Sequence, residues 1–141
     1  MKHLRTLLVV AGLATFAAVN AQGGSVKIIA NLSVKADSIS VDELKNVYLQ
    51  DTSSLKDGSH VEPVLEKGGA THEAFVKDYV GRTDSALQTY YRSLVFTGKG
   101  SMPKVLGSDA EMVAYVAKTK GAIGYVASGA SAEGVKTLEV K

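Results

Sequence analysis

A short glycine turn that leads into a helix is the part of this sequence best suited to bind a ligand. Residues 67–72, KGGATH, follow an apolar stretch and precede a helical pattern. Backbone N–H groups in such a turn, together with the positive end of a helix dipole, can hold an anion. Equally, the two glycines can serve only to permit a tight turn between a strand and a helix. The sequence leaves both interpretations open.

An oxyanion at this turn would meet several kinds of donor. The candidate ligand-binding residues are Gly69, Ala70, Thr71, His72, Lys67 and Lys99. The glycine and the alanine would offer backbone N–H groups, and the threonine would add a hydroxyl. The two lysines would supply positive charge, and the histidine would do so when protonated. Phosphate and sulfate are the ligands that such a set of donors favours.

Motifs that define common enzymes and metal sites are missing from the chain. It contains no Gly-x-Ser-x-Gly elbow, no Walker-type phosphate loop and no Gly-x-Gly-x-x-Gly fingerprint. Beyond the N-terminal segment, His60 and His72 are the histidines, and neither has a second histidine at ligand spacing. Many carboxylates stand at predicted helix starts, where the helix dipole accounts for them. We therefore expect no enzyme, no catalytic residues, no metal and no cofactor.

The first 21 residues have the composition of a secretory signal peptide. Lys2 and Arg5 precede an apolar run, 7–19, which ends in the small-residue site VNA. This run is too short for a confident transmembrane helix, and no later stretch is apolar enough to span a bilayer. We expect cleavage after Ala21, which leaves one domain, 22–141, in the periplasm or secreted. The intact mass of the exported protein would locate the cleavage point.

Charge and composition exclude further classes of protein. The chain has 16 basic and 14 acidic residues, but Lys2 and Arg5 in the signal account for the excess. The remaining domain is neutral, so its charge does not favour nucleic acid as a partner. The absence of cysteine rules out disulfides, thiolate metal sites and a lipidated cysteine. A domain of this length can bury a sufficient core without such links.

Hydrophobic periodicity predicts strands interleaved with helices, which is typical of an α/β fold. The predicted strands are 25–32, 60–65, 122–126 and 134–140, and the predicted helices are 40–49, 71–80, one starting at 83–84, and 108–120. Pro63 places the second strand at a sheet edge or marks a strand end, because proline lacks a ladder donor. The last two strands are too close for a helical crossover, which favours an antiparallel pair.

The helix that starts at 83–84 carries an apolar stripe at helical spacing. Its members are Leu87, Tyr90, Tyr91, Leu94 and Val95. Residues spaced by three and four lie on one face of a helix. We expect this stripe to face the core, with the tyrosines as packing residues rather than as a stacking platform.

Four segments, in order along the chain, resemble one known family. VDELKNVYL, KGGATHEAF, FTGKGSMP and TKGAIGYV are similar to segments of the phosphate-type substrate-binding proteins of ABC transporters, in the type II periplasmic binding protein superfamily. The likeness extends over residues 28–140. It implies a single periplasmic-binding-protein-like lobe, a mixed and mostly parallel sheet flanked by helices. Complete receptors have two lobes that close on the ligand, whereas this chain is long enough for one.

The turn departs from the pattern of the resembled family. The family's serine, glycine, threonine and arginine would align with Gly69, Ala70, Thr71 and His72. Only Thr71 keeps its side-chain donor, and the guanidinium that can grip phosphate with two bonds is missing. The resemblance therefore implies a module related to ABC transport whose affinity for an oxyanion is weak or absent.

Loss of the ligand suggests an alternative function. The chain would then be a cell-envelope interaction protein that no longer binds a ligand. It would use the former cleft face to contact an envelope partner or a second copy of itself. A homodimer of this kind could rebuild a cleft with two walls.

Overall fold

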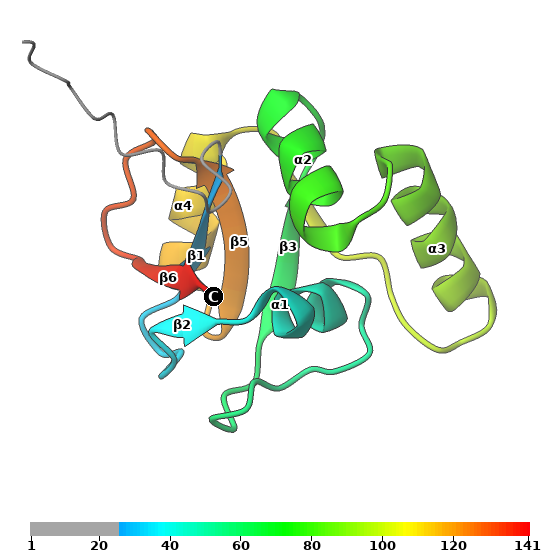
Figure 1. Ribbon diagram of the computed structural model, residues 1–141, viewed down its shortest axis with the longest axis horizontal. Helices are drawn as coiled ribbons and strands as arrows, with labels where there is room; N and C mark the ends of the chain where they lie inside the picture. Colours follow the sequence, from blue (N-terminus) through cyan, green and yellow to red (C-terminus); the bar gives the residue numbers. More distant parts are fainter. Residues whose placement is uncertain (1–25) are drawn as a thin grey trace, which may run out of the picture.

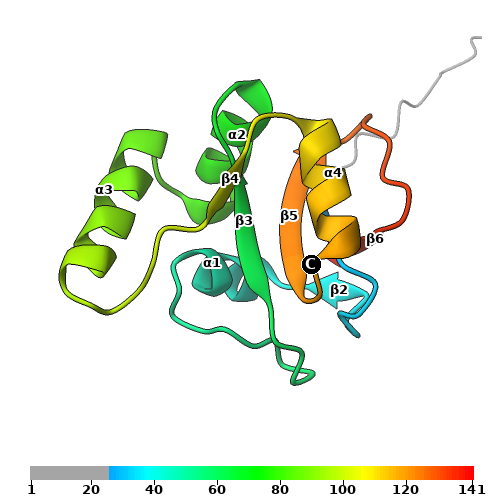
Figure 2. The ribbon, with the colours of Figure 1, turned by 180° about the vertical axis from the view of Figure 1, so that it is seen from behind.

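A six-stranded mixed sheet forms the centre of the computed structural model, which describes residues 26–141 (Figures 1 and 2). The predicted signal peptide lies outside these residues. The strands are β1 (Val26–Ala30), β2 (Ser38–Ile39), β3 (Glu62–Glu66), β4 (Lys104–Leu106), β5 (Ala122–Ala127) and β6 (Lys136–Val140). Their order in the sheet is β2-β6-β1-β5-β3-β4. The pairings of β1 with β5 and β6 are antiparallel, and the other three are parallel. The predicted α/β class and the mixed, mostly parallel sheet are confirmed.

Helices cover both faces of the sheet, and alternate side chains of the strands meet them. The helical elements are α1 (Val41–Tyr48), α2 (Ala70–Phe75), its π-helical continuation η1 (Val76–Val80), α3 (Asp84–Phe96) and α4 (Asp109–Lys118). On one face, Ile29 and Val64 pack with Met112 and Val116 of α4. The larger core on the other face packs the sheet against α1, α2 and η1, which Figure 1 shows in front of the strands.

Local sequence signals account for the helix boundaries. Ser40 Oγ accepts a hydrogen bond from the Glu43 N–H at 3.0 Å, and Ser108 caps α4 in the same way. The glutamate three residues after each serine accepts from an N–H outside the helix: Glu43 from Lys56 and Glu111 from Gly107. Gly81, with a φ of 74°, ends the 70–80 helical segment as predicted.

Two predictions about strand pairing need correction. The antiparallel pairing of the last two strands is wrong, because β1 lies between β5 and β6 and pairs with both. The loop after β5 therefore crosses over one strand before β6 begins. An edge position for the Pro63 strand is also wrong, since β3 lies between β5 and β4. The strand-end alternative is correct: β4 pairs only from Val64 onward, so the missing N–H of Pro63 costs no bond to β4.

The apolar stripe on α3 is buried only in its first half. Leu87 and Tyr91 are fully buried, and the Tyr91 hydroxyl donates to the Tyr48 carbonyl at 2.7 Å. Tyr90 and Leu94 are partly buried and pack against the same core, as predicted, whereas Val95 is 49% exposed, so the prediction for Val95 is wrong. The helical period was correct, but α3 contacts α1 through Tyr91 at mid-helix, and its C-terminal end lies away from the sheet (Figure 2).

The difference in burial along α3 predicts a large and a small loss of stability for two side-chain truncations on this helix. Leu87→Ala should lower the free energy of unfolding by about 2–5 kcal/mol, because it leaves a cavity at a fully buried site. Val95→Ala is the matched control and should change it by less than about 0.5 kcal/mol. Urea unfolding of both variants measures the difference. Equal losses in the two variants would contradict the packing described for α3.

Candidate functional site

The C-terminal ends of three parallel strands meet at one edge of the sheet. β3 ends at Glu66, β4 at Leu106 and β5 at Ala127. The Lys67 N–H donates to the Leu106 carbonyl at 2.8 Å, and Asp109 Oδ2 accepts from the Ala127 N–H at 3.2 Å. Open α/β sheets bind ligands at this edge. The predicted glycine turn, which joins β3 to α2, lies there.

Gly69 has a backbone conformation that side chains other than glycine's rarely permit. Its φ and ψ are 96° and 175°, a region that is essentially reserved for glycine. A Cβ built on Gly69 would meet no other atom within 4 Å, so the requirement comes from the backbone and not from a lack of space. Local geometry therefore explains this glycine whether or not a ligand binds.

Four of the six predicted site residues lie together at the turn. Lys67, Gly69 and Ala70 are exposed and Thr71 is partly buried. No side chain caps the start of α2, so its first N–H groups remain available to an anion. The N–H of Lys67 is already bonded to β4, which leaves its side chain as that residue's contribution.

Lys99 lies far from this turn. It follows the C-terminal end of α3, whereas Asp84 at the other end of α3 contacts His72. A helix of 13 residues is about 20 Å long, so α3 separates the two ends by this distance. Figures 1 and 2 show the same separation between the loop after α3 and the start of α2.

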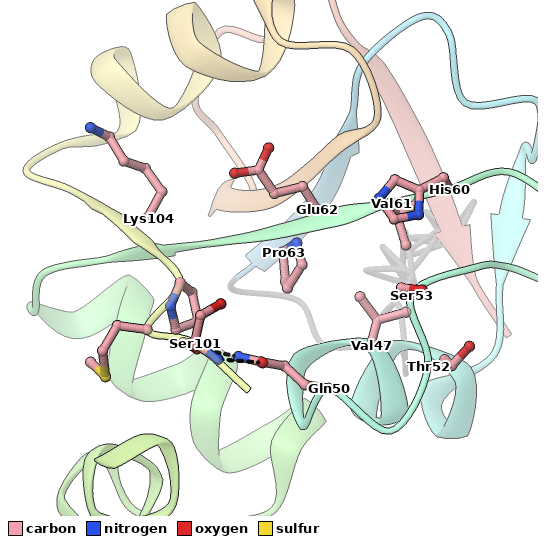
Figure 3. A pocket seen from close by; sticks show the side chains of 12 residues that line it. Val47, Gln50, Thr52, Ser53, His60, Val61, Glu62, Pro63, Ser101 and Lys104 are labelled. Carbon is pink, nitrogen blue, oxygen red and sulfur yellow. Dashed lines mark hydrogen bonds between the residues drawn. The ribbon is translucent and has the colours of Figure 1, made fainter. Parts of the chain in front are cut away.

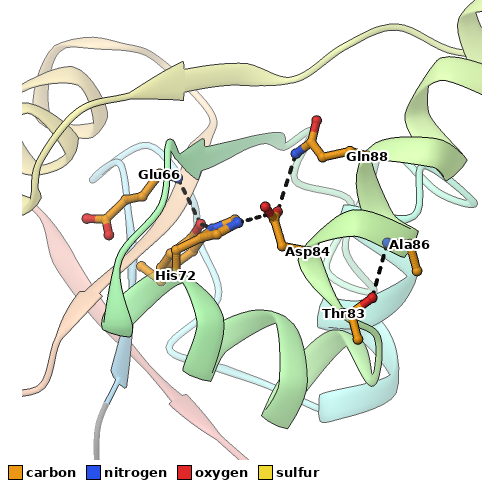
Figure 4. Close-up of polar contacts among 7 residues, drawn as sticks. Glu66, His72, Thr83, Asp84, Ala86 and Gln88 are labelled. Atoms are coloured by element: carbon orange, nitrogen blue, oxygen red, sulfur yellow. Dashed lines mark hydrogen bonds and ion pairs between the residues drawn. The ribbon is translucent and has the colours of Figure 1, made fainter.

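His72 is buried, with 1% of its surface exposed, and both ring nitrogens are engaged (Figure 4). Nε2 lies 2.7 Å from Asp84 Oδ1, and Nδ1 is hydrogen-bonded to the Tyr125 hydroxyl. The same hydroxyl accepts from the Glu66 N–H at 2.8 Å. The pattern is satisfied if Tyr125 donates its hydrogen to Nδ1 and Nε2–H donates to Asp84. No nitrogen of the ring is then left for a ligand.

Glu66 is a buried carboxyl that the sequence analysis did not single out. Its residue surface is 5% exposed, and Oε1 has no hydrogen-bond partner among residues 26–141. Burial raises its pKa to about 8, and a hydrogen bond with Asp109 and the charge of Asp109 act in the same direction. Glu66 is therefore protonated at neutral pH. The only feature of the sequence that points to Glu66 is its place as an acidic residue at the end of the apolar run of β3.

A separate groove of about 280 Å³ lies at the opposite end of β3 (Figure 3). Gln50, which has a φ of 61°, lines this groove. Its side chain bonds to the loop around Ser101, which forms the other side of the groove. Its Nε2 donates to the Ser101 carbonyl at 2.6 Å, and its Oε1 accepts from the Ser101 N–H at 3.1 Å. None of the six predicted site residues lines this groove.

Residues 26–141 lack two further features, a metal site and a membrane span. This part of the chain contains no group of three or more histidine, cysteine or carboxylate side chains placed to hold a metal ion. Nor does it contain a helix that is both long and apolar enough to cross a bilayer.

Comparison with solved structures identifies the architecture as one lobe of a periplasmic-binding-protein-like fold. An ABC-type phosphate transport receptor from Vibrio cholerae matches 82% of this chain with a TM-score of 0.55. PstS from Borrelia burgdorferi matches 83% with a TM-score of 0.61. A protein from Clostridium perfringens, assigned as a phosphate ABC transporter substrate-binding protein and solved with bound phosphate, matches 82% with a TM-score of 0.61.

These similarities concern the fold. Each of the three structures is 14% identical to this chain in sequence. The matched region covers 46% of the Vibrio structure, 47% of the Borrelia structure and 44% of the Clostridium structure, so this chain spans less than half of each. No family profile and no curated protein matches the chain. The neighbours are substrate-binding proteins of transporters rather than enzymes.

The buried Glu66 predicts a specific pH dependence of stability. Its pKa rises from an ordinary value of 4.5 to about 8 on folding, so the folded state retains a proton that the unfolded state has released. This contribution to stability is complete below pH 4.5 and is lost as pH rises through 8, with a slope of up to about 1.4 kcal/mol per pH unit. Glu66→Gln should flatten this slope.

Urea unfolding between pH 4 and 9 measures the effect. Glu62→Gln, near the start of the same strand, is the matched control and should keep the wild-type profile. An unchanged slope in Glu66→Gln would mean that Glu66 does not carry the extra proton.

Proposed function

We propose that this protein is an exported single-lobe binding module that holds a small oxyanion, phosphate or sulfate, weakly at the 67–71 turn. The observation that carries the proposal is the uncapped start of α2, exposed at the C-terminal edge of the parallel strands. Support also comes from the fold neighbours, which include a structure with bound phosphate. The role is that of a binding protein or an accessory to transport, in the periplasm or secreted, and not of an enzyme.

The affinity should be low because few groups reach the ligand. An arginine–phosphate pair contributes about 1.5–3 kcal/mol and a hydroxyl donor about 0.5–1.5 kcal/mol, and the turn retains only the hydroxyl of Thr71. Lys99 is remote and His72 is bonded on both nitrogens. An exposed ligand also remains in contact with water, which weakens charge attraction. We expect a Kd of about 1 mM or weaker, corresponding to about −4 kcal/mol.

Substitutions that restore the family's serine and arginine are poor tests of this site. Gly69→Ser would impose a side chain on a φ of 96°. His72→Arg would place a longer cation in a buried position and break the bonds to Asp84 and Tyr125. Both changes would damage the fold before they could report on the ligand. Thr71 is the better position, since it is partly exposed and its hydroxyl can be removed with little change in shape.

A second candidate function follows from the same strand edge. The chain spans less than half of each fold neighbour, and within residues 26–141 this edge, with the glycine turn, is exposed. In this alternative the chain has lost ligand binding, and the edge contacts a cell-envelope protein or a second copy of the chain. Such a partner would cover the same turn that we propose for the oxyanion.

Phosphate titration followed by backbone amide NMR tests the proposal. We expect shifts of the amides of residues 69–71 that saturate in the millimolar range and weaken with added salt, because exposed charges are screened. Thr71→Val should weaken binding by about two- to tenfold through loss of one hydroxyl donor. Thr89→Val, the same change on the exposed face of α3, is the matched control and should leave the affinity unaltered.

Two outcomes would count against weak oxyanion binding by a single lobe. An absence of shifts at residues 69–71 up to about 50 mM phosphate, well above the expected Kd, would remove the site and favour the envelope-partner alternative. Light scattering after size exclusion, with and without phosphate, separates the remaining cases. A dimer that forms only with phosphate would mean that two copies share the ligand.

A further inference from the structure

One segment of the chain combines positive charge with exposed apolar side chains. Residues 85–108 contain no aspartate or glutamate, although the whole chain has 14 acidic residues. The cations within this segment are Arg92, Lys99 and Lys104, and all three are exposed. The proposed oxyanion site lies elsewhere, at the start of α2, so it does not account for this charge.

Large apolar residues gather in the same segment. Six such residues are exposed in the described part of the chain, and four of them fall between positions 95 and 105: Val95, Phe96, Met102 and Val105. Phe96 is 92% exposed, at the very end of α3. A nearly free phenylalanine is costly in water unless another surface covers it. We call residues 92–104 the basic tip.

The basic tip is held in a defined conformation. The N–H groups of Lys99 and Gly100 both donate to the Leu94 carbonyl, at 2.9 and 3.2 Å, so the chain folds back on the end of α3. Gln50 then fixes the next residue, Ser101, through two hydrogen bonds to its backbone (Figure 3). These contacts preorganise the exposed side chains, which lowers the entropy cost of binding.

The tip lies at one end of the molecule. Figures 1 and 2 place α3 on the opposite side of the molecule from β6, and they place the loop after α3 away from the start of α2. Glu62 lines the same groove as Lys104 and reduces the positive charge there. Glu62 is already bonded to the Tyr115 hydroxyl at 3.2 Å. The tip can therefore meet a surface without burying the glycine turn.

We propose that the basic tip binds the surface of an anionic lipid bilayer. Lysine and arginine are attracted to such a surface, and aromatic and aliphatic side chains enter the boundary between headgroups and acyl chains. Phe96 is 92% exposed at a helix end, where a bilayer can accept it without a complementary pocket. A protein partner would instead need a cavity of matching shape. The protein would lie on the bilayer through this tip while its strand edge stays free.

Fluorescent labelling can detect this insertion at single positions, because the chain has no cysteine of its own. The Met102→Cys variant carries an environment-sensitive NBD group within the tip. The Leu32→Cys variant carries the same label at a residue that is 66% exposed in another part of the fold. With vesicles of equal phosphatidylglycerol and phosphatidylcholine, we expect a blue shift at 102 and none at 32. This local signal does not depend on any binding by the apolar run at 7–19.

Vesicle co-sedimentation of variants tests the two physical contributions separately. Phe96→Ser should weaken binding by about fivefold or more through loss of buried apolar area, whereas Leu32→Ser should change it by less than about twofold. Lys99→Glu should weaken binding by about tenfold or more, while the control Lys77→Glu, exposed in η1, should have little effect. Binding should fall as salt is raised and should be weak on pure phosphatidylcholine.

Several results would overturn the proposal. The first is that the chain fails to bind the anionic vesicles. The second is that the labels at positions 102 and 32 respond equally. The third is that Phe96→Ser and Leu32→Ser weaken binding equally. Self-association through Phe96 without vesicle binding would identify the tip as a protein interface instead. Phosphate has no part in these measurements, so they stand or fall independently of the oxyanion site.

Discussion

The hydroxyl of Tyr125 is the contact on which the arrangement of this domain depends. It accepts from the backbone of β3 at Glu66 and is bonded to His72 of α2, and His72 continues the chain of bonds to Asp84 of α3. The Tyr125 ring stacks on Phe75 with centroids 3.9 Å apart and planes 8° apart. One residue on an interior strand thus joins two strands and two helices. Burial raises its pKa, so the hydroxyl remains a donor.

This network gives the glycine turn a structural role. In the resembled family the position of His72 would hold an arginine facing the ligand, whereas here the side chain is turned inward and ties α2 to β5 and α3. What remains at the surface is the part that the backbone supplies: a glycine in a conformation reserved for glycine, and a helix start without a side-chain cap. Such a turn can attract an anion, but its other task is to position α2.

Much of the fold could be predicted from the sequence because its signals are local. Ser40, Thr83 and Ser108 mark helix starts, and each accepts the expected N–H. Strands β2 and β4 have two and three residues, too few for any periodicity to indicate them. The position of β1 between β5 and β6 depends on contacts that are distant in sequence. The exposed end of α3 also escaped prediction, because an apolar stripe does not reveal what it faces.

The candidate site, like the fold, could be predicted from the sequence only in part. The turn itself lies where the sequence placed it, but Lys99 is about one helix length away and His72 belongs to a buried network. The backbone N–H of Glu66, the hydroxyl of Tyr125 and the carboxylate of Asp84 come together only in three dimensions. No spacing in the sequence indicates that β3, β5 and α3 bring these groups to one histidine.

The central claim is that His72 is a structural link and not a ligand group, and its ring nitrogens report this directly. Long-range ¹H–¹⁵N spectra distinguish the two neutral tautomers from the doubly protonated ring. The account predicts the tautomer with hydrogen on Nε2, and ring shifts that stay constant as phosphate is added, even while the amides of residues 69–71 move. Ring shifts of His72 that change as phosphate is added would show that His72 contacts the ligand, and would contradict the account.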